Sequence, residues 1–174
     1  MKENAEQYAH RIALDFEYQA TDNGVEFVHC LCAIDEVTGQ KWMLRMSELQ
    51  QLDRLPFPTG PDTLLIVYAG AAEMNALRAL NMELPRCDVF DCYYEFLGWL
   101  NCRQVTEDPD MSRGGILNAC RLFGIDACET EHKDRMRAIC IENQIIPDEH
   151  IWDVIQYCLD DCKITLQLFR KLLP

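Results

Sequence analysis

Hydrophobic residues in the first part of the chain occur in short runs that end at turn-forming residues. Runs of this length, rich in β-branched and aromatic residues, are typical of strands. The pair Asn23-Gly24 is a strong hairpin signal, and Thr38-Gly39 forms a second turn. The pattern predicts an antiparallel meander of three strands, at residues 12–18, 25–34 and 40–46.

The middle of the chain alternates strands with helices. Residues 63–68 form a continuous apolar run, as expected for a strand that is covered on both faces in a parallel sheet. Small residues at 70–72 lead from this run into a helical pattern at 73–80, and they would allow a backbone or ligand to approach closely. A short strand at 87–91 and a helix at 93–99 are predicted next.

The last third of the chain is predicted to be helical after a polar loop at residues 103–113. One helix at 116–123 should end at Gly124, a second spans 133–141, and a long last helix begins at 147–149. The chain thus begins with strands, continues with strands that alternate with helices, and ends with helices alone. This order is typical of an α/β fold in which helices flank a mixed sheet. We therefore expect the whole chain, 1–174, to form one such domain.

The composition fits a folded domain in water. Of the 174 residues 49% are hydrophobic, yet no run of about 18 uncharged apolar residues occurs and the first seven residues are too polar for a secretory signal. We expect a cytoplasmic protein with no membrane-spanning segment. Its ten cysteines should then be reduced and mostly buried.

The net charge limits how the chain could bind nucleic acid. A formal charge of -13 argues against a protein that holds nucleic acid mainly by neutralising phosphates. Divalent metal ions would weaken that objection, because bound cations become the largest local charges in a site.

Acidic residues recur at three places that a fold could bring together. Asp15 and Glu17 occupy alternate positions of a predicted strand, so both side chains should project from one face. Glu73 begins the helix that follows the buried strand. Tyr157 and Asp161 lie four residues apart in the last helix and therefore share a side of it. Each acid alone is typical of a solvated surface, but together they predict a site.

The order of these motifs resembles the DEDD superfamily of 3'-5' exonucleases, in its tyrosine subclass, which has a ribonuclease-H-like fold. The first motif of that family, Asp-x-Glu, is matched by Asp15-Phe16-Glu17, and the third, Tyr-x-x-x-Asp, by Tyr157 and Asp161. Over nearly its whole length the chain is similar to the N-terminal proofreading exonuclease domain of phage family A DNA polymerases. Segments 68–73, 84–91 and 131–137 also look like blocks of that phage group.

The resemblance implies a substrate, a partner and a role for Glu73. The substrate would be the 3' end of single-stranded DNA, and the partner a polymerase domain in the same chain or a separate polymerase. The second motif of the superfamily usually places Asn-Ala before an Asp, whereas here Gly70-Ala71-Ala72 precede Glu73. Asp91, on the next strand, competes for this role, and we expect Glu73 to fill it.

Four carboxylates without a histidine cluster suit hard divalent cations. Two Mg²⁺ or Mn²⁺ ions about 3.5–4 Å apart would activate a water and stabilise the leaving oxygen of a phosphodiester. We expect Asp15 to bridge the two ions, with Glu17, Glu73 and Asp161 completing the ligands. Tyr157, whose unperturbed pKa is about 10, would orient the attacking water rather than act as a base.

Several alternatives stay open in the sequence. The substrate could instead be RNA or short oligoribonucleotides, or the chain could be a catalytically silent module that only binds or scaffolds. Cys30/Cys32 and Cys158/Cys162 could be halves of a zinc site, but their spacing is unusual and no histidine accompanies them, so core cysteines are expected. The four histidines are expected at the surface or in packing.

Overall fold

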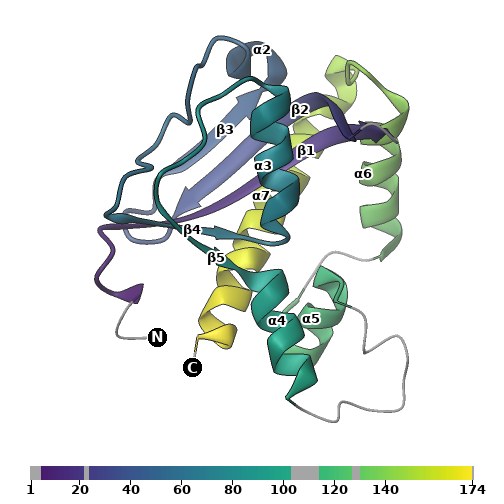
Figure 1. The fold of residues 1–174 in the computed structure, drawn as a ribbon. Helices are drawn as coiled ribbons and strands as arrows, with labels where there is room; N and C mark the ends of the chain where they lie inside the picture. The colour runs from purple at the N-terminus through teal and green to yellow at the C-terminus, as the bar shows by residue number, and fades with distance from the viewer. Residues whose placement is uncertain (1–4, 22–23, 103–113, 127–129, 174) are drawn as a thin grey trace.

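One mixed sheet organises the part of the chain that the computed structural model describes, which is residues 5–21, 24–102, 114–126 and 130–173. Its strands follow the order β3-β2-β1-β4-β5 (Figure 1). The strands are β1 (His10–Thr21), β2 (Gly24–Asp35), β3 (Lys41–Arg45), β4 (Thr63–Val67) and β5 (Asp88–Asp91). The helices are α2 (Met46–Leu49), α3 (Gly70–Ala79), α4 (Cys92–Asn101), α5 (Ile116–Phe123), α6 (Thr130–Glu142) and α7 (Asp148–Leu172).

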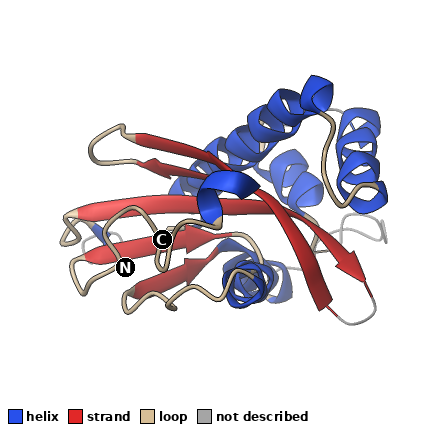
Figure 2. Ribbon diagram, turned by 90° about the horizontal axis from the view of Figure 1, so that it is seen from above, coloured by secondary structure: helices blue, strands red, loops and turns tan. Residues whose placement is uncertain are grey.

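The strand directions confirm the predicted fold class. β1 pairs antiparallel with β2, and β2 with β3, so the first three strands form the expected meander. β4 joins the other edge of β1 in parallel, and β5 continues in parallel beside β4. The strands form one layer with helices on its two sides (Figure 2). No described helix is both long and apolar enough to cross a membrane.

Alternation along the strands sorts the core into two clusters, one on each face of the sheet. Ile12, Leu14 and Phe16 of β1 belong to the cluster that α3 covers. Ala13 belongs to the other cluster, which α4, α5, α6 and α7 complete. Asp15 and Glu17 follow Ala13 at steps of two residues, so their side chains fall on the α7 side of the sheet.

Most predicted elements occur, with bounds that differ by a few residues. β1 and β2 extend past the predicted 12–18 and 25–34, because their pairing continues through two register shifts to Thr21 and Gly24. Gly124 ends α5 in the left-handed conformation, with a φ of 64°, as predicted. The predicted loop at 103–113 and the tip of the first hairpin, residues 22 and 23, lie outside the described residues.

The junction between β4 and α3 is tightly built. Helix α3 begins at Gly70, three residues before the predicted start, and follows Ala69 in the left-handed conformation with a φ of 66°. A Cβ on Gly70 would lie 2.9 Å from Val67 Cγ2 and 3.2 Å from Asp91 Oδ2. The small residues at 70–72 therefore permit the close backbone approach that the sequence indicated.

Asp91 holds this junction in place. Its carboxylate accepts hydrogen bonds from the backbone N–H groups of Ala69 (3.1 Å) and Gly70 (2.8 Å). It also caps helix α4, because Oδ1 accepts the N–H of Tyr93 at 2.9 Å. These three bonds occupy Asp91 in joining two helix starts to the end of β5.

Replacing Asp91 should therefore weaken the fold. We expect Asp91→Ala to lower the free energy of unfolding by about 1–3 kcal/mol, since it removes a helix cap and leaves backbone N–H groups without acceptors. Chemical denaturation followed by circular dichroism measures this change. Asp53→Ala, at an exposed aspartate, is the matched control and should change stability by less than about 0.5 kcal/mol. Equal stability of the two variants would contradict the prediction.

Candidate active site

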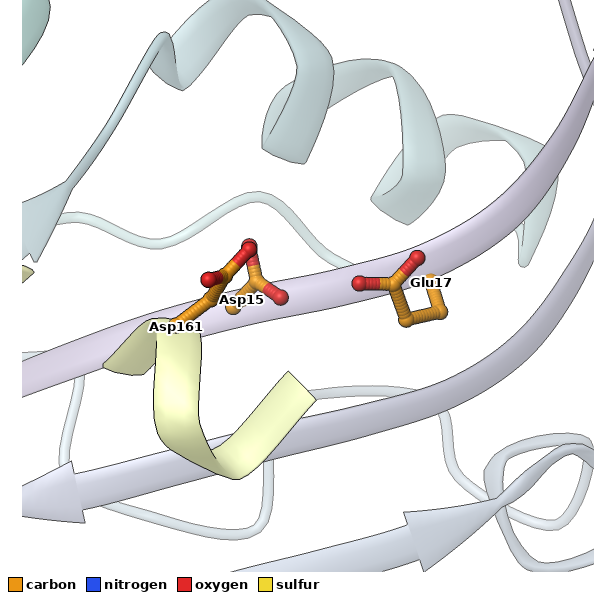
Figure 3. Close-up of side chains that lie close together, drawn as sticks. All are labelled: Asp15, Glu17 and Asp161. Atoms are coloured by element: carbon orange, nitrogen blue, oxygen red, sulfur yellow. The ribbon is translucent and has the colours of Figure 1, made fainter. Parts of the chain in front are cut away.

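Three of the predicted site residues meet on the α7 side of β1. One carboxylate oxygen from each of Asp15, Glu17 and Asp161 lies within 4.8 Å of the others. Figure 3 shows Asp15 and Glu17 on the strand, with the carboxylate of Asp161 reaching Asp15 from the facing helix. Among the described residues no other group of three or more acidic, histidine or cysteine side chains meets this spacing.

Helix α7 carries Asp161 to this position. One side of the helix is buried against β1 and β2, and thiol groups there hydrogen-bond across the contact. Cys158 Sγ donates to the carbonyl of Asp15 at 3.3 Å, and Cys162 Sγ donates to the carbonyl of Cys32 at 3.2 Å. Cys32 Sγ in turn donates to the carbonyl of Ile155 at 3.3 Å. These bonds place Asp161 beside the acids of β1.

Four cysteines could have formed halves of a zinc site, judging by the sequence alone. In the structure they are packing residues. Cys30, Cys32, Cys158 and Cys162 are buried free thiols between α7 and the sheet. They do not form a metal-ligand group within the described residues. Burial raises the pKa of Cys162 well above its usual value, which keeps this thiol protonated and able to donate a hydrogen bond.

Glu73 approaches the same acids from α3, the helix that packs on the other face of the sheet. It lies in the first turn of α3, is 3% exposed, and its carboxylate lies near the backbone N–H of Phe16, the residue between Asp15 and Glu17. It stands outside the group of three. Its pKa is raised by burial first and then by the negative charges of Asp15 and Glu17. Of the two candidates for the second motif, Glu73 faces these acids, whereas Asp91 is occupied with backbone N–H groups.

Tyr157 lies one turn before Asp161 on α7 and is also buried. Burial raises the pKa of its hydroxyl above the usual value, and the negative charge of Asp161 raises it further. A phenol with a raised pKa stays protonated at neutral pH, so it can donate a hydrogen bond but is a poor base. The role of orienting the attacking water stays a prediction.

Lys133 of α6 belongs to the same neighbourhood, and no role was predicted for this residue from the sequence. Its Nζ lies 3.1 Å from Asp161 Oδ2 and 5.5 Å from the centre of the Tyr157 ring. Its positive charge opposes the raised pKa values of Asp15 and Glu17. Lys133 and Asp161 are far apart in sequence, so no local pattern could have revealed the pair.

The histidines follow the prediction that they serve at the surface or in packing. His29 is buried, and its ring nitrogen Nε2 lies 2.9 Å from the carbonyl oxygen of Cys140. His132 is exposed, and its ring centre lies 6.2 Å from that of Tyr157.

The electrostatics of the site are unfavourable for the protein alone. Burial first, and the charge of Asp161 second, raise the pKa of Asp15 to about 8. Burial and the charge of Asp15 likewise raise the pKa of Glu17 well above its usual value. Asp15 Oδ2 and Glu73 Oε2 are buried without a hydrogen-bond partner among the described residues. Buried acceptors without donors and closely spaced acids fit hard divalent cations such as Mg²⁺ or Mn²⁺.

Comparisons with known proteins support the fold. No protein-family model matches the chain, and no curated protein matches it. The structure of RNase D from Trypanosoma brucei matches 99% of this chain with a TM-score of 0.62 and 17% identity, over 61% of its own length. The same enzyme in complex with RNA U12 matches 99% of this chain with a TM-score of 0.61 and 18% identity, over 59% of its length.

A further solved structure, described as the apo form of a nuclease, matches 99% of this chain at a TM-score of 0.58 and 16% identity, over 75% of its length. At these identities the likeness shows the fold, so the chain has the mixed-sheet fold found in RNase D. The chain corresponds to about three fifths of the length of the RNase D structures.

The raised pKa of Asp15 predicts how stability depends on pH. The folded protein holds this proton up to about pH 8, while the unfolded chain releases it near the ordinary value of 3.8. Stability without metal should therefore fall as the pH rises between these two values, because the unfolded state binds fewer protons. Asp15→Asn should flatten this fall and raise the thermal midpoint at pH 8, as measured by calorimetry in chelator.

Asp35→Asn is the matched control for this prediction. Burial disfavours the charge of Asp35, but hydrogen bonds from His10, Val37 and Thr38 outweigh it and lower its pKa. The ionised Asp35 carboxylate stabilises the fold at pH values above the ordinary pKa of 3.8. Asp35→Asn should therefore lower the thermal midpoint at pH 8. A lower midpoint for Asp15→Asn at pH 8 would show that its carboxylate is not under electrostatic strain.

Proposed function

We propose that the chain is a metal-dependent 3'-5' exonuclease that removes nucleotides from the end of a single strand. The observation that carries this proposal is the group of Asp15, Glu17 and Asp161 within 4.8 Å, with unpaired buried oxygens on Asp15 and Glu73. The fold shared with RNase D supports the same reaction class.

The residues have distinct roles in this proposal. Asp15, Glu17, Glu73 and Asp161 would hold the metal. Two bound divalent ions supply an activated water and stabilise the leaving oxygen of the phosphodiester. Tyr157 keeps its proton and donates a hydrogen bond that orients the attacking water.

A catalytically silent binding module is less consistent with this geometry. Buried carboxylates that repel one another and lack donors destabilise a fold, and such strain is concentrated at functional sites. A module that only bound a partner would be more stable with these acids replaced. The tyrosine-subclass assignment, which rests on Tyr157 and Asp161, is part of the proposal.

DNA and RNA compete as the substrate, and each has separate support. The resemblance to phage polymerase domains supports single-stranded DNA, with proofreading beside a polymerase as the setting. The fold match to RNase D in complex with RNA U12 supports RNA. Parallel assays with single-stranded DNA and RNA of the same base sequence, in magnesium, manganese and chelator, distinguish the two.

The first prediction of this proposal concerns Asp161. Asp161→Ala should lower the rate of nucleotide release by more than about 100-fold, because a lost metal ligand should cost more than a lost outer-shell partner. Asp160→Ala is the matched control, since Asp160 is half-exposed and pairs with Lys163 outside the acidic group. The assay follows a 5'-labelled oligonucleotide on a sequencing gel. Undiminished digestion by Asp161→Ala, or full activity of the unmodified protein in chelator, would contradict the proposal.

The second prediction separates the roles of Tyr157 and Asp161. Tyr157→Phe removes only the hydroxyl, so we expect hydrolysis to slow by about 10–100-fold while metal affinity stays near normal. Asp161→Ala should impair both. Calorimetric titration with Mn²⁺ measures metal binding without turnover. Equal losses of metal affinity in the two variants would mean that the tyrosine supports the helix rather than the water.

A further inference from the structure

A cleft lies between α5 and α6, next to the acidic group. Its volume is about 360 Å³, and its lining includes Asn118 and Arg121 of α5 with Thr130, Lys133 and Arg137 of α6. Clefts of this size lie at the lower end of the range for small-molecule sites, with room for about one nucleotide unit. In Figure 1, α6 stands beside the end of β1 and α5 lies below it, next to α4.

The cleft gathers positive charge in a chain whose formal charge is -13. Arg121, Lys133 and Arg137 line it, and among the described residues of the lining Asp134 is the one acid. Within the described part of the chain, the Arg121 side chain donates a hydrogen bond to the amide oxygen of Asn118, at 3.5 Å. Neither Arg121 nor Arg137 forms an ion pair with a residue that the structure describes. Two exposed guanidinium groups thus line the cleft, and guanidinium groups are well suited to bind phosphate.

Lys133 connects the cleft to the acidic group. It lines the cleft and also pairs with Asp161 at 3.1 Å. Arg137 lies one turn further along α6, and its charge acts on the hydroxyl of Tyr18 in β1. Helix α6 packs against β1, the strand that carries Asp15 and Glu17.

We propose that this cleft binds the phosphate backbone of the single strand next to the phosphodiester that is cut. Arg121 and Arg137 would donate to phosphate oxygens, and Lys133 would lie between the cleft and the cut bond. This inference rests on the proposed exonuclease function and names how its substrate is held. Contacts of this kind bind nucleic acid without reading its sequence.

The cleft changes what the composition alone implies for binding. Few phosphates can be neutralised on the surface as a whole, but three cations in one place can neutralise a short run of them. Each phosphate contact with a single strand adds about 0.7 to the slope of log affinity against log salt. Binding should therefore be salt-dependent, with the dependence confined to this cleft.

The test compares two double variants with the same change in charge. Arg121→Gln/Arg137→Gln removes the cleft arginines. Arg78→Gln/Arg135→Gln is the control, because Arg78 contacts Asn75 at 3.4 Å much as Arg121 contacts Asn118, and Arg135 lies on α6 outside the cleft. Fluorescence anisotropy with a 5'-labelled deoxythymidine 12-mer, in chelator to prevent hydrolysis, measures affinity from 50 to 200 mM salt.

We expect the cleft variant to have a slope shallower by about 1.4, which is two phosphate contacts at about 0.7 each. Over that fourfold range of salt, the unmodified protein and the control should then lose about sevenfold more affinity than the cleft variant. If the double variant misfolds by circular dichroism, each single variant should show about half the change. Equal slopes for the cleft variant and the control would overturn the inference.

Failure of this inference can be told apart from failure of the proposed function. Binding is measured in chelator and does not require catalysis. If the unmodified protein releases no nucleotide with magnesium or manganese, the exonuclease proposal fails and the cleft loses its substrate. If it does release nucleotides while the cleft variant and the control show the same KM, the exonuclease stands and the cleft assignment is wrong. A several-fold rise in KM for the cleft variant alone supports it.

Discussion

The contact between α7 and the first two strands is the constraint on which the rest of the structure depends. The helix buries one side against the sheet, and thiols of Cys158 and Cys162 donate to carbonyls of the strands. Thiol hydrogen bonds are individually weak, but here they occur in a well-packed interface that does not tolerate a shift of one turn. Because Asp161 lies within this contact, packing sets its distance from Asp15. The two acids repel one another, so their own interaction would not bring them together.

That packing opposes the electrostatics of the site. Asp15, Glu17 and Asp161 repel one another, and burial raises the pKa of both β1 acids. Lys133 offsets part of the repulsion through its ion pair with Asp161, and Glu73 adds a further buried carboxylate from α3. The fold thus holds these acids in an arrangement that they would not adopt alone, which is the condition for binding cations tightly.

Charge is distributed so that acidic and basic regions lie side by side. The acids collect on the strand and on α7, while the cations of the cleft come from α5 and α6. The protein can therefore be strongly acidic overall and still present hydrogen-bond donors to a phosphate chain beside the acidic group. In the exonuclease we propose, the metal ions and the cations of the cleft would both neutralise phosphates of the nucleic acid.

The sequence by itself determined the features that depend on backbone geometry over a few residues. Strand alternation places Asp15 and Glu17 on one face, and the helical repeat places Tyr157 beside Asp161, because both periods are local properties of the chain. Only the tertiary structure decided which face of the sheet meets α7, that Glu73 rather than Asp91 faces the acids, and that Lys133 pairs with Asp161. Those outcomes join residues that are distant in sequence, and they follow from how whole elements pack, which no local period specifies.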